Sequence, residues 1–262
     1  MYADLESLSS VLRENERKRR EFEQARQDWA SGVTHDLKTP LSYISGYADM
    51  LLSDRHEWSP DEQKEFLQSI REKSAYMEEL IHDLGIAFRM DRSAGVELAA
   101  QSIELTEFVR RTVAETANLP LHKQNRFEIS GGEQPLYIWG DAGLLKRAFS
   151  NLLLNAIVHN PAGTSVFVRM ESAEGGSRVR LQIADNGEGM DERSVARLFD
   201  RYYRGTSTDT PAGGTGLGMA IVKQIVAAHQ GTIEVESQVG RGTSITVVLS
   251  ADRRSEADEK HE

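Results

Sequence analysis

The first 90 residues place their apolar side chains at helical spacings, and this limits the possible folds more than any other feature of the sequence. Residues 1 to about 55 predict one long helix with a heptad pattern. The two seam positions hold Leu5, Leu12 and Val33, and Leu8, Phe22 and Trp29. Polar residues interrupt the seam, so we expect a marginal parallel coiled coil; a solvated charged helix is the alternative.

A second helix is predicted to begin at Ser59 and Pro60, which suit the N-cap and the first helical position. Apolar residues then repeat three and four apart at Leu67, Ile70, Met77, Ile81, Leu84 and Phe88. A hairpin of two such helices has too little core by itself, so two copies are expected to pair into a dimeric four-helix bundle. The alternative is a hairpin that packs on the rest of its own chain.

The remaining sequence changes to alternating strand patterns after an expected linker at residues 89 to 101. Strands are predicted at 126–130, 136–139, 165–170, 178–184, 232–236 and 243–249. Helices are predicted at about 106–117, 141–159, 191–202 and 216–230. This order predicts an α/β sandwich with one helical layer, and the charged tail from Ala251 is expected to fray.

Composition excludes several classes of function. A formal net charge of -10 argues against a protein that binds nucleic acid by neutralising phosphates. The absence of cysteine excludes disulfides, thiolate metal sites and cysteine nucleophiles. No apolar run approaches a membrane-spanning length and no signal peptide is visible, so we expect a cytoplasmic chain as it stands, whether whole or a fragment of something larger.

Two glycine clusters suggest contact with an extended ligand. Gly213, Gly214, Gly216 and Gly218 open a predicted helix, where backbone amides favour an anion. Asp185 ends a predicted strand directly before Gly187 and Gly189, although DNGEG alone also fits a simple turn. Together the clusters suggest opposite ends of one ligand.

Three polar residues share one face of the helix predicted at 141–159. Asn151, Asn155 and His159 are four residues apart, and asparagine is a poor residue for a helix interior. An amide oxygen that binds Mg²⁺ beside phosphate oxygens would explain them, whereas two surface asparagines are the alternative.

The segment THDLKTPL carries the candidate nucleophile. On a helix of about 100° per residue, His35 lies roughly 160° from the centre of the apolar stripe and should face solvent. Thr39 follows one turn later on nearly the same side, and Pro40 should bend the helix. An exposed histidine alone indicates little about function.

In combination these motifs resemble the transmitter region of two-component sensor histidine kinases. THDLKTPL is similar to the H-box, NLLLNA to the N-box, DNGEG to the G1 box, LFDRYYR to the F-box, GGTGLGMAIVK to the G2 box and GRGT to the last glycine motif. The resemblance covers about residues 25–250. It implies a coiled-coil signalling helix at 1–24, a dimerisation and phosphotransfer domain at 25–91, a linker at 92–101, a Bergerat-type ATP-binding domain with a mixed sheet at 102–250 and a disordered tail at 251–262.

The resemblance also implies roles for single residues. His35 would be the phosphoacceptor, Asp185 would bind the adenine amino group above Gly187 and Gly189, and Arg204 would contact the γ-phosphate. Asn155 would hold Mg²⁺, supported by Asn151. The ATP lid would span about 200–215, and the other nucleotide contacts would be His159, Tyr203, Gly214, Thr215, Gly216, Leu217, Gly218 and Thr243. Val158 departs from the family, because many relatives have a lysine or arginine there that touches phosphate.

Asp36 and Thr39 are expected to assist His35. Asp36 accepts a hydrogen bond from Nδ1 in this interpretation, so that Nε2 is free to attack. The pattern His-Asp-x-x-Thr resembles family members that also dephosphorylate their regulator, with Thr39 orienting a water. The alternative is a buried threonine that bonds a helix carbonyl near Pro40.

The resemblance implies a homodimer that uses Mg-ATP and passes the phosphoryl group to an aspartate of a response-regulator receiver domain. An N-terminal sensor or membrane domain, absent from this chain, is also expected. Two other functions compete: an ATPase of the same nucleotide fold that does mechanical work, which lacks a phosphoacceptor helix, and a dimeric scaffold with a decayed nucleotide site.

Overall fold

The computed structural model describes residues 2–53, 56–90, 98–119, 124–200, 203 and 216–252. Inside helices it describes the backbone alone at residues 2–12, 18, 21, 22, 25, 26, 28, 29, 87, 89 and 90. The chain divides into two compact units, Met1–Leu84 and Gly85–Glu262. Neither unit contains, among these residues, a helix long and apolar enough to cross a bilayer.

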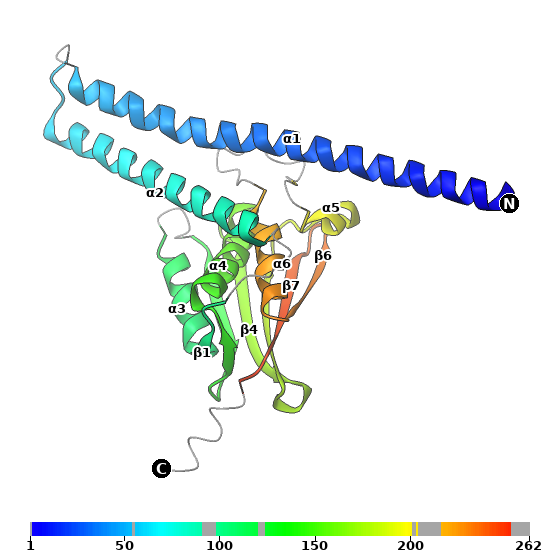
Figure 1. Cartoon of the computed structure of the whole chain (residues 1–262). Coiled ribbons are helices and arrows are strands. Elements are labelled where there is room, and N and C mark those ends of the chain that lie inside the picture. The colour runs from blue at the N-terminus through cyan, green and yellow to red at the C-terminus, as the bar shows by residue number, and fades with distance from the viewer. Residues whose placement is uncertain are drawn as a thin grey trace. The chain divides into compact units, whose positions relative to one another are not determined.

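Unit 1 is a hairpin of two long helices, α1 (Tyr2–Leu52) and α2 (Pro60–Met90). The residues of α2 from Gly85 onward are assigned to unit 2. Figure 1 shows the two helices side by side and joined at one end. The predicted long first helix is confirmed, and it continues through Pro40. The seam side chains at Leu5, Leu8, Leu12, Phe22 and Trp29 lie outside the described side chains, so the coiled coil stays a prediction.

The start of α2 is fixed by a reciprocal pair of hydrogen bonds. The Ser59 hydroxyl accepts from the Glu62 amide at 3.3 Å, and the Glu62 carboxylate accepts from the Ser59 amide at 2.8 Å. This capping box satisfies two amides that the first turn leaves without helical partners. A bond that the Ser59 hydroxyl donates to the Glu62 carboxylate at 2.7 Å, together with the bond from the Ser59 amide, lowers the pKa of Glu62. The predicted N-cap is therefore confirmed.

Aromatic contacts join α1 to α2 near the hairpin turn. The indole N–H of Trp58 donates to the Met50 carbonyl at 2.9 Å, near the end of α1. The Phe66 ring lies 4.9 Å from the Trp58 ring and 5.3 Å from the Tyr47 ring, centroid to centroid. These contacts hold the two helices together at this end.

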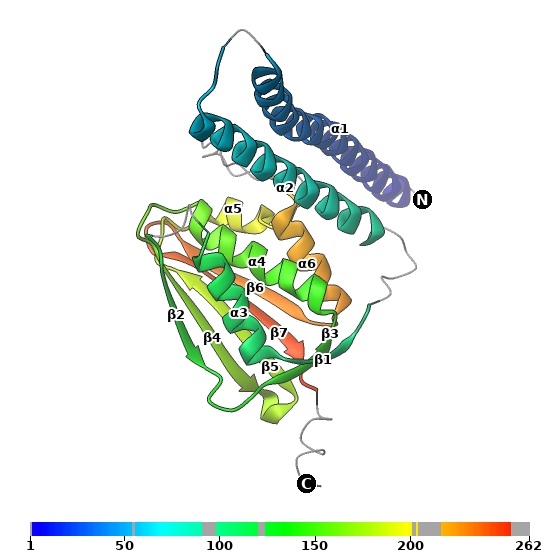
Figure 2. The same ribbon diagram turned by 90° about the vertical axis from the view of Figure 1, so that its left-hand side faces the viewer.

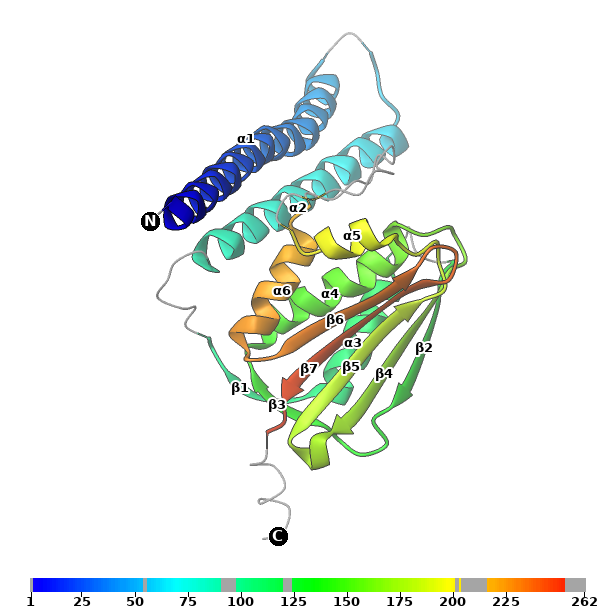
Figure 3. The same ribbon diagram turned by 90° about the vertical axis from the view of Figure 1, so that its right-hand side faces the viewer.

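Unit 2 is a five-stranded mixed sheet with helices on one face. The strand order is β2 (Arg126–Gly131), β4 (Ser165–Ala173), β5 (Arg178–Asp185), β7 (Gly242–Ser250) and β6 (Thr232–Gln238). Only β2 and β4 run parallel among these pairs. Helices α3 (Leu105–Ala117), α4 (Ala142–Val158) and α6 (Gly218–Ala228) cover one face (Figure 2), and the view from the other side shows the strands in front (Figure 3). The predicted sandwich with one helical layer is confirmed.

The core lies between this helical layer and the sheet. On β5 the side chains of Val179, Leu181 and Ile183 are buried, which confirms the predicted alternation. Helix α4 contributes the longest set of buried side chains: Leu145, Ala148, Phe149, Leu152, Leu153, Ala156 and Ile157. The Phe149 ring meets Phe108 of α3 edge to face at 6.1 Å.

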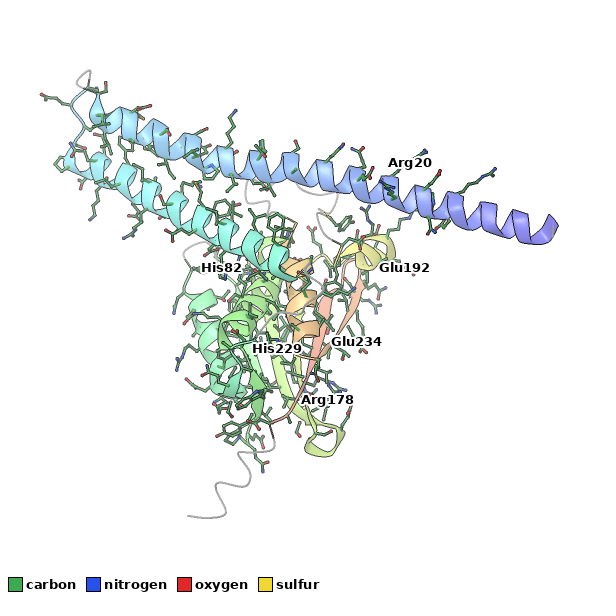
Figure 4. All side chains as sticks on the ribbon, viewed as in Figure 1. Arg20, His82, Arg178, Glu192, His229 and Glu234 are labelled. Carbon is green, nitrogen blue, oxygen red and sulfur yellow. The ribbon has the colours of Figure 1, made fainter. Side chains whose placement is uncertain are left out.

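His229 joins the C-terminal end of α6 to the N-terminal end of α4. His229, at the C-terminal end of α6 (Figure 4), accepts a hydrogen bond from the Asp141 amide at Nε2, 3.0 Å away. Its Nδ1 lies 2.8 Å from the Ile225 carbonyl and therefore carries the proton. Asp141 is the N-cap of α4. The two helices are thus tied at the end opposite to the glycine-rich turn that starts α6.

Several elements differ from the sequence predictions. Strand β1 (Gln101–Glu104), which was not predicted, pairs antiparallel with β3 (Tyr137–Gly140). Helix α5 spans only Glu192–Arg197, and a short 3₁₀ turn, η2 (Glu174–Gly176), joins β4 to β5. Order also extends past Ser250: Ala251 bridges to Ile138, and the Asp252 amide donates to the Tyr137 carbonyl. The expected tail is therefore shorter by two residues, and the rest of it lies outside the described residues.

The alternation of β5 gives a direct test of the core. Leu181→Ala should lower the free energy of unfolding by about 2–5 kcal/mol, because it leaves a cavity in the core. The neighbouring Arg180→Ala removes an exposed ion pair with Glu171 and should cost less than about 1 kcal/mol. Urea unfolding followed by circular dichroism measures both free energies. Equal losses would contradict the assignment of Leu181 to the core and Arg180 to the surface.

Candidate functional site

Asp185, at the end of β5, is the centre of one group of predicted residues. Its Oδ1 accepts hydrogen bonds from the amides of Gly187 at 2.9 Å and Thr243 at 3.3 Å. Burial raises the pKa of Asp185, while these two bonds and the Asn160 side chain oppose the rise. The structure thus brings Asp185, Gly187 and Thr243 together, with the carboxylate as a partly enclosed acceptor.

The glycines beside Asp185 are needed because two turns pack closely. Gly189 has φ +65°, and a Cβ there would lie 2.0 Å from the Gln238 carbonyl oxygen. Gly242 has φ +94°, and its Cβ would lie 1.9 Å from the Asp185 carbonyl oxygen. The Gly240 amide also donates to the Glu188 carbonyl at 2.7 Å. The β5–α5 loop and the β6–β7 turn are therefore held backbone to backbone.

Two residues that the sequence reasoning missed support these turns. The Ser237 hydroxyl accepts from the Met190 amide at 2.8 Å and donates to the Gly242 carbonyl at 3.1 Å. The Asn186 side-chain oxygen accepts from the Ser165 amide at 2.8 Å. The Met190–Ser237 and Ser165–Asn186 bonds join residues 47 and 21 positions apart, so no local motif could have identified them.

Helix α4 places Asn151 beside the start of α6, with Asn155 one turn further along the helix. The Asn151 amide group donates to the Gly218 carbonyl at 3.3 Å, which ties α4 to the first turn of α6. Asn155 is half-buried, and within the described part of the chain its side chain has no hydrogen-bond partner. His159 is the exposed C-cap of α4, and partial desolvation lowers the pKa of its imidazole.

The start of α6 offers backbone amides to an anion. Gly216 has φ +68°, and the N-cap residue is Leu217, whose buried side chain cannot accept a hydrogen bond from the first amides. A helix start without a side-chain cap, preceded by glycine, is a favourable place for a phosphate group. Gly218 is the first helical residue and lies against the Asn151 side chain.

Not all of the predicted nucleotide residues fall in the described part of the chain. Arg204, Gly214 and Thr215 lie outside the described residues, as does most of the expected lid. Tyr203 is described: its hydroxyl donates to the Ser194 hydroxyl at 3.2 Å, and the Arg197 guanidinium lies 4.4 Å from its ring centroid.

His35 is exposed on α1 of unit 1, as predicted. Its side chain is 78% exposed, and Nδ1 lies 3.5 Å from Oδ1 of Asp36. The Asp36 side chain is only 12% exposed. The carboxylate is therefore on the Nδ1 side of the ring, which leaves Nε2 as the outer nitrogen.

Thr39 bonds to the helix, although it is not buried. Its hydroxyl donates to the His35 carbonyl at 3.0 Å, and the residue is exposed. Thr34 and Ser42 make the same type of bond to carbonyls four residues earlier. The alternative interpretation expected a buried threonine bonded to a helix carbonyl: the bond is present, but Thr39 is exposed. The Thr39 oxygen can still accept a hydrogen bond.

Comparisons with known proteins agree for both units. Residues 25–91 match the family model of the His Kinase A (phospho-acceptor) domain. Residues 140–253 match that of the Histidine kinase-, DNA gyrase B-, and HSP90-like ATPase. Sensor histidine kinase YvrG of Bacillus subtilis is 38% identical over 249 residues, which are 95% of this chain and 42% of the relative.

Two further relatives extend the comparison. Sensor-like histidine kinase SenX3 of Mycolicibacterium smegmatis is 30% identical over 251 residues, covering 92% of this chain and 62% of its own length. The solved structure of the mycobacterial sensor histidine kinase MprB is 30% identical with a TM-score of 0.52, covering 58% of this chain and 98% of the solved one. The chain spans about half the length of the curated relatives it matches. With a phospho-acceptor region followed by an ATPase region, it belongs to the two-component sensor histidine kinase family.

Proposed function

We propose that this chain is the kinase part of an ATP-dependent sensor histidine kinase, which phosphorylates its own His35. The observation that carries this proposal is the exposed His35 imidazole with the Asp36 carboxylate on its Nδ1 side. An ATPase of the same nucleotide fold that does mechanical work lacks a phosphoacceptor helix. The Asp185 loop and the glycine-framed start of α6 weigh against a scaffold with a decayed nucleotide site.

In the proposed reaction, Nε2 of His35 attacks the γ-phosphorus of ATP. The new N–P bond forms as the bond to the β,γ-bridging oxygen breaks, and ADP leaves with that electron pair. The attacking nitrogen has to be unprotonated, so the ring proton belongs on Nδ1, where Asp36 stabilises the positive charge that develops. The phosphoramidate product then passes its phosphoryl group to an aspartate of a response-regulator receiver domain.

Unit 2 supplies the proposed nucleotide site. Asp185 accepts the adenine amino group, Gly187 and Gly189 lie beneath the base, and the start of α6 meets the phosphates. The remaining contacts predicted from the family, including Arg204, belong to the same proposal. Asn155 fits a magnesium ion because its half-buried amide has no partner among the described residues, and neutral oxygens suit this ion. When bound, Mg²⁺ would offset charge on the phosphates.

We also propose that two copies pair through unit 1. The hairpin leaves large apolar side chains exposed, among them Leu41 at 51%, Leu67 at 58% and Ile81 at 58%. A second hairpin would cover such side chains in a four-helix bundle. The phosphotransfer domain at 25–91 and the ATP-binding domain at 102–250 are the proposed functional boundaries, and a sensor region elsewhere in the whole protein would supply the signal.

The first test asks whether His35 is the phosphoacceptor. With γ-labelled ATP and Mg²⁺ the protein should acquire a label that is stable to base and lost in acid, and His35→Gln should abolish it. His82→Gln is the matched control, because His82 is also an exposed histidine of the hairpin (Figure 4) and its loss should leave labelling unchanged. No labelling of the wild-type protein would favour the scaffold.

The second test concerns adenine recognition by Asp185. In Asp185→Asn the side-chain oxygen can keep both amide bonds, but an N–H₂ donor replaces the outer acceptor. We expect the Kd for ATP to rise about 10- to 100-fold, the effect of losing a hydrogen bond to a charged group. Burial raises the pKa of Asp185, so at neutral pH the ionised carboxylate lowers the free energy of unfolding of the domain. This loss disappears at low pH, where the carboxyl is protonated in both the folded and the unfolded states.

The same variant therefore separates binding from folding. At pH 7 the free energy of unfolding without nucleotide should be unchanged or raised in Asp185→Asn, while calorimetry detects the weaker ATP binding. A variant that unfolds more easily yet binds ATP normally would contradict the assigned role.

The third test concerns regulator dephosphorylation, which Thr39 is proposed to assist by orienting a water. Thr39→Ala should slow dephosphorylation of a phosphorylated receiver domain by about tenfold, the effect of one lost hydrogen bond, without changing autophosphorylation. Ser42→Ala removes an equivalent backbone bond one turn later and serves as the control. Equal dephosphorylation rates in both variants would eliminate the phosphatase role of Thr39. A receiver domain accepted in a phosphotransfer screen provides the substrate.

A further inference from the structure

Asn160 links the end of α4 to the loop that carries Asp185. Its side-chain N–H₂ donates to the Ala156 carbonyl at 2.9 Å, a carbonyl of the last helical turn. Its side-chain oxygen accepts from the Glu188 amide at 2.9 Å. One amide group therefore caps the helix and holds the middle of the DNGEG loop.

The loop also lies directly on this amide. A Cβ on Gly187 would come within 1.9 Å of Oδ1, 2.1 Å of Cγ and 2.6 Å of Nδ2 of Asn160, and these are its three nearest heavy atoms. A side chain at 187 would need the space that the Asn160 side chain occupies, so residue 187 has to be glycine while Asn160 keeps this position. The Gly187 amide, held in this position, donates to Oδ1 of Asp185 at 2.9 Å.

Asn160 influences both the proposed adenine-binding carboxylate and the loop that follows it. Its side chain helps to limit the rise of the Asp185 pKa that burial causes. It also holds the Glu188 amide, three residues further along the loop. A carboxylate that reads an amino group needs fixed orientation, since a poorly aligned hydrogen bond contributes little.

We propose that Asn160 is a positioning residue for base recognition: it sets the shape of the Asp185–Gly189 loop so that the Asp185 carboxylate meets the adenine amino group. This inference rests on the proposed nucleotide site. It assigns to Asn160 no contact with the nucleotide. The competing explanation is that Asn160 only caps α4, in which case its loss would weaken folding but not base selectivity.

The test compares nucleotide binding by the full chain and its variants. Asn160→Ala should raise the Kd for ATP about tenfold, with a similar rise in KM and kcat within about twofold, and should reduce the preference for ATP over GTP. Asn125→Ala is the matched control, because its side chain also donates to a backbone carbonyl of unit 2, that of Thr164 at 3.2 Å. This control should keep the wild-type Kd and ATP preference. Unchanged ATP affinity and base preference in Asn160→Ala would overturn the proposal.

A double-mutant cycle tests the link to Gly187. Gly187→Ala alone should weaken ATP binding, and it should add little in the Asn160→Ala background, because the clash has been removed. Fully additive effects would overturn the inference. Should Asn160→Ala fail to fold, Asn160→Asp keeps the size and the acceptor but loses the amide donor and repels Asp185; normal ATP binding by that variant would count against the proposal.

These outcomes are distinct from failure of the proposed function. If the wild-type chain binds neither ATP nor GTP, the nucleotide site itself is wrong. If the wild type binds ATP selectively and Asn160→Ala does so equally well, only the role of Asn160 fails.

Discussion

The burial of α4 against the sheet and its neighbouring helices is the constraint on which unit 2 depends. Its apolar face packs in the core through Leu145, Phe149, Leu152, Leu153 and Ile157. Because that face is fixed, the rotation of the helix about its axis is fixed as well, and this sets the directions in which Asn151 and Asn155 point. The helix ends at Val158, and Asn160, just beyond the C-cap His159, bonds to the loop that follows Asp185. Core packing and site geometry are therefore set by one element.

The sequence predicted well the features that depend on local pattern. The alternation of β5, the spacing of the α4 asparagines and the Ser59–Pro60 helix start each follow from a short-range rule. It failed for β1, whose four residues carry no alternation and form a strand only by pairing with β3. The role of Asn160 was missed for a similar reason: the Asn160–Pro161 dipeptide indicates a turn, but its bond to the Glu188 amide joins segments 28 residues apart.

In unit 1 the hydroxyl side chains around His35 bond to the backbone of their own helix. Thr34, Thr39 and Ser42 return their hydroxyl hydrogens to the helix backbone, so none of them requires a partner elsewhere. Asp36 is enclosed while the His35 ring beside it is exposed. The carboxylate lies on the Nδ1 side of the ring, so Nε2 is the nitrogen farther from it.

In the proposed nucleotide site, position 158 holds valine, which carries no charge to offset that of the phosphates. Two basic side chains of unit 2 lie over aromatic rings: Arg197 over Tyr203 at 4.4 Å and Lys223 over Phe199 at 5.6 Å. The start of α6 offers positive potential through its backbone amides, and the helix dipole adds to them. Such fixed dipoles need no side-chain ordering to hold a phosphate, and in the proposed site the bond from Asn151 to the Gly218 carbonyl fixes the turn that carries them.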